Sequence, residues 1–200
     1  MSGSEFKLTD PHSLRAYAHP LRLSLIGLLR RRGPMTATQA AAELGDSVPN
    51  CSFHLRQLAK YGFAERAPGA DARDRPWRAT AQTTSWSDDS DDPELRAATD
   101  QLNSVVLGQY LRHAETYLAR RPDEPAEWRT AAGFGDRLLY VTAQELSALQ
   151  AEVEQVYARY DARHVDPTTR PAGHREVQVV QLSIPLTPVP PTGPTEADRD

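Results

Sequence analysis

Residues 36–45, TATQAAAELG, and residues 46–62, DSVPNCSFHLRQLAKYG, carry the clearest structural signals in the chain. Thr36 and either Asp46 or Ser47 are residue types that cap helix N-termini, and each stands before a run of helix-forming residues. Gly45 and Gly62 stand where helices end, because glycine accepts the left-handed backbone of a C-terminal cap. The stretch therefore predicts two helices and the turn between them, over 37–44, 49–61 and 45–48.

The second of these helices has two different faces. Cys51, Leu55 and Leu58 are spaced by four and three residues, which places them on one buried face. The opposite face carries Asn50, Ser52, Phe53, Arg56, Gln57 and Lys60. Asn and Gln can pair with adenine, Arg with guanine, and Phe can contact the thymine methyl group. A helix of this kind fits the major groove of DNA, and we expect Asn50, Phe53 and Arg56 to read bases.

Two helices are expected before this stretch. A capping Thr9 or Asp10 and then Pro11 predict a short helix that reaches Ala18. The pair His19-Pro20 interrupts the chain, and apolar residues spaced by three and four predict the next helix. It ends in Arg30 to Arg32 and Gly33, where cations are favourable, and we expect these arginines to be solvated.

Two short strands are expected after residues 36–62. They are Phe63–Arg66 and Trp77–Ala79, and a loop from Pro68 to Pro76 lies between them. Three segments together, HPLR (19–22), SVPNCSFHLRQL (47–58) and GF (62–63), make residues 10–80 resemble the ArsR-type winged helix-turn-helix repressors. The resemblance implies a recognition helix over 49–60 and a wing over 68–76. It also implies a homodimer, formed through the first and last helices, that binds an inverted-repeat operator in double-stranded DNA and leaves it when a small-molecule effector binds.

The residues expected to contact DNA come from the helix pair and, through the resemblance, from the wing. Thr36, Thr38, Gln39 and Lys60 are expected to anchor phosphates, and the resemblance adds Arg73 and Arg75. The full set is Thr36, Thr38, Gln39, Val48, Pro49, Asn50, Ser52, Phe53, His54, Arg56, Gln57, Lys60, Arg73 and Arg75. Three alternatives stay open: a hydrogen bond of His54 inside the domain, packing of Phe53, and ion pairs of Arg73 and Arg75 with the wing aspartates.

Metal sensing and catalysis find little support in the sequence. Metal-sensing ArsR proteins carry paired cysteines in the third helix, where this chain reads TATQAA (36–41), and Cys51 is its single cysteine. The position of Cys51 on the apolar face favours a core residue over a redox switch. No phosphate-binding glycine loop and no nucleophile beside a base can be read. We therefore expect no metal, no cofactor and no enzymatic activity.

Charge divides the chain into two halves. Through Trp86 there are 12 Lys and Arg against 7 Asp and Glu, a net charge of +5; from Ser87 onward the numbers are 11 and 20, a net charge of −9. A basic first half is typical of a module that binds polyanions. A single cysteine, no leader sequence and no apolar run of membrane-spanning length (about 18 residues) predict a soluble cytoplasmic protein.

The whole chain is expected to be mainly α-helical with a little β-structure. SGSEF (2–6) is typical of residues left by cloning, so residues 1–8 are expected to be disordered. The capping box TAQE (142–145) predicts a helix, and Leu138–Val141 and Val177–Ile184 predict strands on either side of it. The expected parts in order are the winged-helix DNA-binding domain (9–82), an acidic linker (83–92), a dimerisation helix (93–121), a strand-helix-strand unit (122–184) and a disordered tail (185–200).

These observations, together with the resemblance, predict a homodimeric, sequence-specific DNA-binding transcription regulator that acts as a repressor. The alternative is a winged-helix module that binds another protein through its acidic second half, since a fold does not settle a function.

Overall fold

The computed structural model describes residues 5–68, 75–87 and 89–188 of the chain. The chain divides into two units, residues 1–170 and residues 171–200. The elements of the first unit are β1 (Glu5–Leu8), α1 (Pro11–Tyr17), α2 (Pro20–Arg32), α3 (Ala37–Leu44), α4 (Val48–Lys60), β2 (Ala64–Arg66), β3 (Trp77–Ala79), β4 (Thr83–Trp86), α5 (Pro93–Arg120), α6 (Ala126–Ala131), α7 (Ala143–Ala158) and α8 (Ala162–Val165), with short 3-10 turns at Arg121–Asp123 and Pro167–Thr169.

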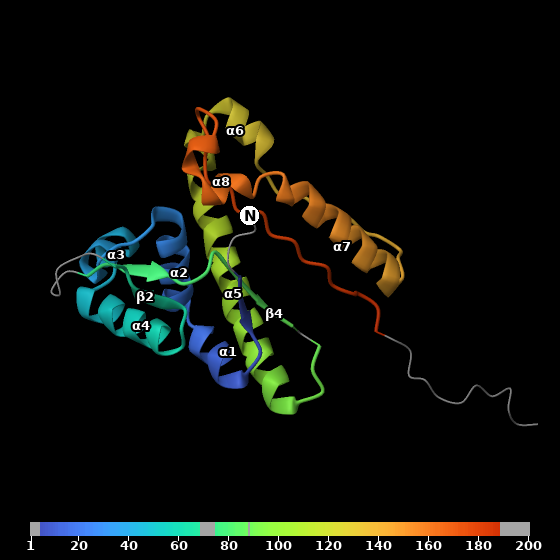
Figure 1. Cartoon of the computed structure of the whole chain (residues 1–200). Helices are drawn as coiled ribbons and strands as arrows, with labels where there is room; N and C mark the ends of the chain where they lie inside the picture. The colour runs from blue at the N-terminus through green and yellow to red at the C-terminus, as the bar shows by residue number, and fades with distance from the viewer. Residues whose placement is uncertain (1–4, 69–74, 88, 189–200) are drawn as a thin grey trace, which may run out of the picture. The chain divides into compact units, whose positions relative to one another are not determined.

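Helices α1 to α4 enclose the hydrophobic core, and α1 and α2 pack against α5 (Figure 1). Each of these four helices begins at a side-chain cap, which satisfies amide groups that the helix itself leaves unpaired. The largest fully buried side chains come from α1, α2, α4 and α5: Leu14, Leu25, Ile26, Cys51, Leu55, Leu58 and Leu102. The helices and caps predicted for residues 9–61 are therefore present.

Strands β2 and β3 form an antiparallel hairpin in which Arg66 lies opposite Trp77. Met35, just before α3, exchanges backbone hydrogen bonds of 3.0 and 2.7 Å with Trp77. These two bonds fix the base of the hairpin against the start of α3. Helices α3 and α4 with this hairpin form a winged helix-turn-helix, as the sequence predicted. The predicted wing loop lies largely in residues 69–74, outside the described residues.

A second small sheet corrects two predictions. Residues 1–8 were expected to be disordered, but Glu5–Leu8 forms β1 and pairs in parallel with β4, Thr83–Trp86. The apolar side chains of β1 explain the difference: Leu8 is 3% exposed and the Phe6 ring lies 4.7 Å from Phe63. The linker expected over 83–92 is likewise a strand in its first four residues.

The Arg30 side chain binds β4 and the segment just before it, whereas the sequence predicted that this arginine would be solvated. Its Nε donates to the Ala81 carbonyl over 2.9 Å, and a terminal nitrogen donates to the Thr84 hydroxyl over 2.6 Å. Burial lowers the pKa of its guanidinium. Arg30 is therefore a structural residue that links α2 to the second sheet.

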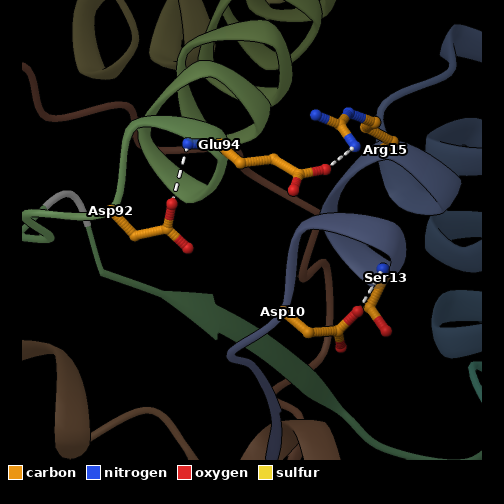
Figure 2. Close-up of polar contacts among 5 residues, drawn as sticks. All are labelled: Asp10, Ser13, Arg15, Asp92 and Glu94. Carbon is orange, nitrogen blue, oxygen red and sulfur yellow. Dashed lines mark hydrogen bonds and ion pairs between the residues drawn. The ribbon is translucent and has the colours of Figure 1, made fainter.

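Helix α5 packs against α1, and its fully buried side chains lie in its first half. Asp10 and Asp92 cap α1 and α5 by accepting amide hydrogen bonds of 2.9 Å from Ser13 and Glu94, and Arg15 pairs with Glu94 over 2.7 Å (Figure 2). Ala98 and Leu102 of α5 are fully buried in the core. Farther along α5 three leucines, Leu107, Leu111 and Leu118, are 43%, 57% and 49% exposed.

The predicted strand-helix-strand unit is only partly present. Its helix, α7, begins at the expected capping box of Thr142 and Glu145. Residues 138–141 and 177–184, which were expected to be strands, have no strand structure. Their apolar side chains are exposed and no strand pairing includes them, and a strand needs a partner that supplies its hydrogen bonds.

The second unit has no helix or strand within its described residues, 171–188. The predicted disordered tail, 185–200, lies outside the described residues from 189 onward. Among the helices that the structure describes, none has the length and apolar character needed to cross a membrane.

Candidate nucleic-acid interface

The turn between α3 and α4 sets the direction of α4. Gly45 caps α3 with a left-handed backbone (φ 66°), a conformation that glycine adopts without steric cost. The Ser47 hydroxyl then caps α4 by accepting the amide hydrogen bond of Asn50 over 3.3 Å. Asp46 accepts from the Ser47 amide over 2.6 Å and from the Asn50 side-chain amide over 2.9 Å. These bonds lower the pKa of the Asp46 carboxyl, so it is ionised.

The tie between Asp46 and Asn50 changes what Asn50 can do. Its NH₂ group is one of the two groups needed for a bidentate pair with adenine, and it already donates to Asp46. Asn50 is exposed, but it must leave Asp46 before it can bind a base in this way. Sequence reasoning missed this restraint, because Asp46 was considered only as a cap.

The exposed face of α4 carries the other predicted base-reading residues. Phe53 is 48% exposed, Arg56 and Lys60 are exposed, and Ser52 and Gln57 are partly exposed. Val48 and Pro49 are exposed at the start of the helix. Cys51, Leu55 and Leu58 on the other face are completely buried, and burial raises the pKa of the Cys51 thiol. The two-faced pattern predicted for this helix is therefore present.

His54 was predicted among the DNA-contacting residues, and its burial contradicts this. It is 7% exposed, and its ring lies 4.2 Å from the ring of His19 and 5.1 Å from that of Phe53. Burial lowers the pKa of His54, and the nearby His19 and Arg22 lower it further. The alternative of an internal hydrogen bond is not seen at Nδ1, which is buried without a partner among the described residues. His54 is a packing residue that joins α4 to the start of α2.

Thr36 and Gln39 form the capping box of α3. The Thr36 amide donates to Gln39 Oε1 over 2.8 Å, and the Gln39 amide donates to the Thr36 hydroxyl over 3.2 Å. The Gln39 carbonyl is therefore occupied within the helix, although its NH₂ group and the hydroxyl proton of Thr36 remain donors. Thr38, in the first turn of the same helix, is exposed.

The base of the wing brings a further arginine to this region. Arg75 is exposed, whereas Arg73 lies outside the described residues. The Arg66 guanidinium lies 3.8 Å from the centre of the Trp77 ring and donates a hydrogen bond to the Arg75 carbonyl. Sequence reasoning missed Arg66 as a site residue. The signal was available, since Arg66 and Trp77 flank the wing loop at the ends of the two predicted strands.

These elements surround a small polar hollow of about 160 Å³ between the start of α3, α4 and the wing. It is lined by Thr36, Ala37, Thr38, Ser52, Arg66, Arg75 and Trp77. The pKa of Arg66 is lowered by burial, then by the positive charges of Arg75 and Arg56. The helix pair and the wing thus concentrate three guanidinium groups beside the exposed face of α4. Among the described residues, the structure assembles no group of three His, Cys, Asp or Glu side chains that could hold a metal ion.

Comparisons with known proteins agree with this geometry in the first third of the chain. Residues 17–67 match the family model of a helix-turn-helix domain. No curated protein matches the chain. A solved structure, the transcriptional regulator Tm0710 from Thermotoga maritima, aligns with 78% of this chain and 89% of its own at 11% identity and a TM-score of 0.30. The helix-turn-helix domain is therefore established by the family model and the geometry together.

Proposed function

We propose that this protein is a homodimeric, sequence-specific DNA-binding transcription regulator of the ArsR type, and that it acts as a repressor. The observation that carries the proposal is the exposed face of α4, with Phe53 and Arg56 standing out from a helix whose other face is completely buried. The second helix of a helix-turn-helix is the one that enters the major groove, where Phe53 can contact a thymine methyl group and Arg56 can pair with guanine. The family match over 17–67 supports the same conclusion.

Each exposed residue of α4 has a defined task in this proposal. Arg56 pairs with guanine, Phe53 contacts a thymine methyl group, and Ser52 and Gln57 hydrogen-bond to neighbouring bases. Lys60, one turn farther along the helix from Arg56, contacts a phosphate. Asn50 joins them only when its amide leaves Asp46.

The homodimer is supported by helix α5. Its 28 residues extend about 42 Å, and its later residues include exposed leucines. Leu107, Leu111 and Leu118 share one face of the exposed half, and a second copy of α5 would cover them. A two-fold dimer would present two α4 helices to DNA and would therefore recognise an inverted repeat. Release from DNA by a small-molecule effector belongs to the proposal through the family resemblance.

Selection from a randomised pool of duplex DNA tests the proposal. The wild-type protein is expected to enrich an inverted repeat with half-sites about one helical turn, 34–36 Å, apart. Gln150→Ala on α7 is the matched control and should enrich the same repeat, whereas Phe53→Ala should relax it at one position of each half-site. A folded wild-type protein that enriches no sequence would contradict the proposal and would favour a protein-binding module.

A further inference from the structure

The hollow between α3, α4 and the wing is lined in a way that suits an anion. Two of its lining side chains are the guanidinium groups of Arg66 and Arg75, and Thr36, Thr38 and Ser52 add hydroxyl groups. None of its lining residues, all within the described part of the chain, is a carboxylate. The nearest acid on the same strand, Glu65, is engaged by Arg78 over 2.6 Å. The described lining of the hollow is therefore cationic and hydroxylic, which is the chemistry that binds an oxyanion.

Arg66 is held in a fixed orientation there. Its guanidinium lies 3.8 Å from the Trp77 ring centre and donates to the Arg75 carbonyl, so the plane and one edge of the group are fixed. Trp77 is 5% exposed and is anchored to Met35 by two backbone hydrogen bonds. Burial, then the positive charges of Arg75 and Arg56, lower the pKa of Arg66, and a bound anion would act in the opposite direction. The Trp77 indole N–H is also buried without a partner among the described residues.

The start of α3 adds to the same positive field. Ala37 and Thr38, in the first turn of α3, line the hollow, and first-turn amide groups point out of a helix with the positive end of its dipole. The first turn of α3 contains no acidic residue that would oppose this field.

We propose that the hollow binds one phosphate of the DNA backbone, with Arg66 as its central ligand and Trp77 as the residue that positions Arg66. This inference rests on the proposed function, which supplies the DNA. Because Ser52 of α4 shares the hollow with Thr38 of α3 and the arginines of the wing, one phosphate bound there ties all three elements to a single point on the backbone. The site sets how deeply α4 enters the groove and carries no sequence information itself.

The salt dependence of binding to a 30-base-pair duplex of arbitrary sequence tests this site, because phosphate contacts do not depend on sequence. Arg66→Gln is compared with Arg78→Gln, a matched loss of one charge from the facing strand. Each lost phosphate contact makes the negative slope of log K against log[salt] less steep by about 0.9. The ratio of the wild-type affinity to the variant affinity should therefore fall by about 3.5-fold between 50 and 200 mM salt. Arg66→Gln is expected to show this change, and Arg78→Gln is expected to keep the wild-type slope.

A second pair of variants keeps the test independent of wing stability. Thr38→Glu places a carboxylate in the hollow at a position where helices favour acidic residues, so α3 is expected to remain folded. Ala42→Glu adds the same charge to an exposed position farther along α3. Thr38→Glu should weaken binding at least ten-fold more than Ala42→Glu.

The outcomes separate this site from the proposed function. If the wild type binds DNA and Arg66→Gln keeps its salt slope, or if both variants of a pair behave alike, the phosphate site is wrong and the regulator proposal stands. If the wild type binds neither this duplex nor any selected sequence, the proposed function fails, and the site fails with it.

Discussion

Replacement of Leu111 by alanine should weaken the dimer without unfolding the protein. Leu111 is 57% exposed in the single chain, and complete burial of a leucine side chain contributes about 2 kcal/mol. Covering the exposed part therefore contributes about 1 kcal/mol, and the two-fold symmetry doubles this to about 2 kcal/mol per dimer. The dimer dissociation constant should rise about 30-fold.

Sedimentation equilibrium over a range of protein concentrations measures this change. Gln101→Ala, on an exposed position in the first half of α5, is the control and should leave the dissociation constant unchanged. Thermal unfolding of the Leu111 variant at low concentration, where both proteins are monomeric, should match the wild type. A Leu111→Ala protein with the wild-type dissociation constant, or a wild type that is monomeric at every concentration, would refute the assignment of α5 as the dimer interface.

Three further predictions concern the DNA-binding domain. The free energy of unfolding should fall as the pH drops below 6.5, because burial holds the pKa of His19 and His54 below that value in the folded protein and the unfolded chain then binds more protons. Urea titrations at a series of pH values measure this change, and a free energy that does not vary with pH would show that the two histidines are solvated. Arg56→Ala should lose about 1 to 3 kcal/mol of discrimination at one base pair of each half-site, and unchanged preference in competition binding would remove Arg56 from base reading. Arg30→Met should destabilise the fold by about 2 kcal/mol, because two charged hydrogen bonds are lost. Urea unfolding measures this change, and Arg32→Met, at an exposed position, is the control that should have no effect.

The helix-turn-helix could be predicted from sequence because local rules decide it. Thr36, Gly45 and Ser47 each act within a few residues of their own position, and the structure shows the caps that these residue types predict. The buried face of α4 follows in the same way from helical periodicity. The two strands of the wing were found because turn-forming residues separate them.

The remaining errors come from contacts between residues far apart in the sequence. Arg30 binds a carbonyl 51 residues away, and β1 pairs with a strand nearly 80 residues later; neither contact has a local signature. The stack of His54 on His19 joins two helices, and this packing contact, which buries a residue predicted to touch DNA, has no local signature. The apolar segment 177–184 has the composition of a strand, but composition does not supply a partner, and in the single chain it remains unpaired.

Methylation interference tests most directly the central claim, that the exposed face of α4 reads the major groove. A duplex that contains the selected sequence is methylated sparsely at guanine N7, which lies in the major groove, and bound and free DNA are then compared. If α4 lies in the groove, methylated guanines should be depleted from the bound fraction at matching positions in both half-sites, and Arg56→Ala should lose this depletion at one of them. Equal methylation of bound and free DNA throughout the site would contradict the account.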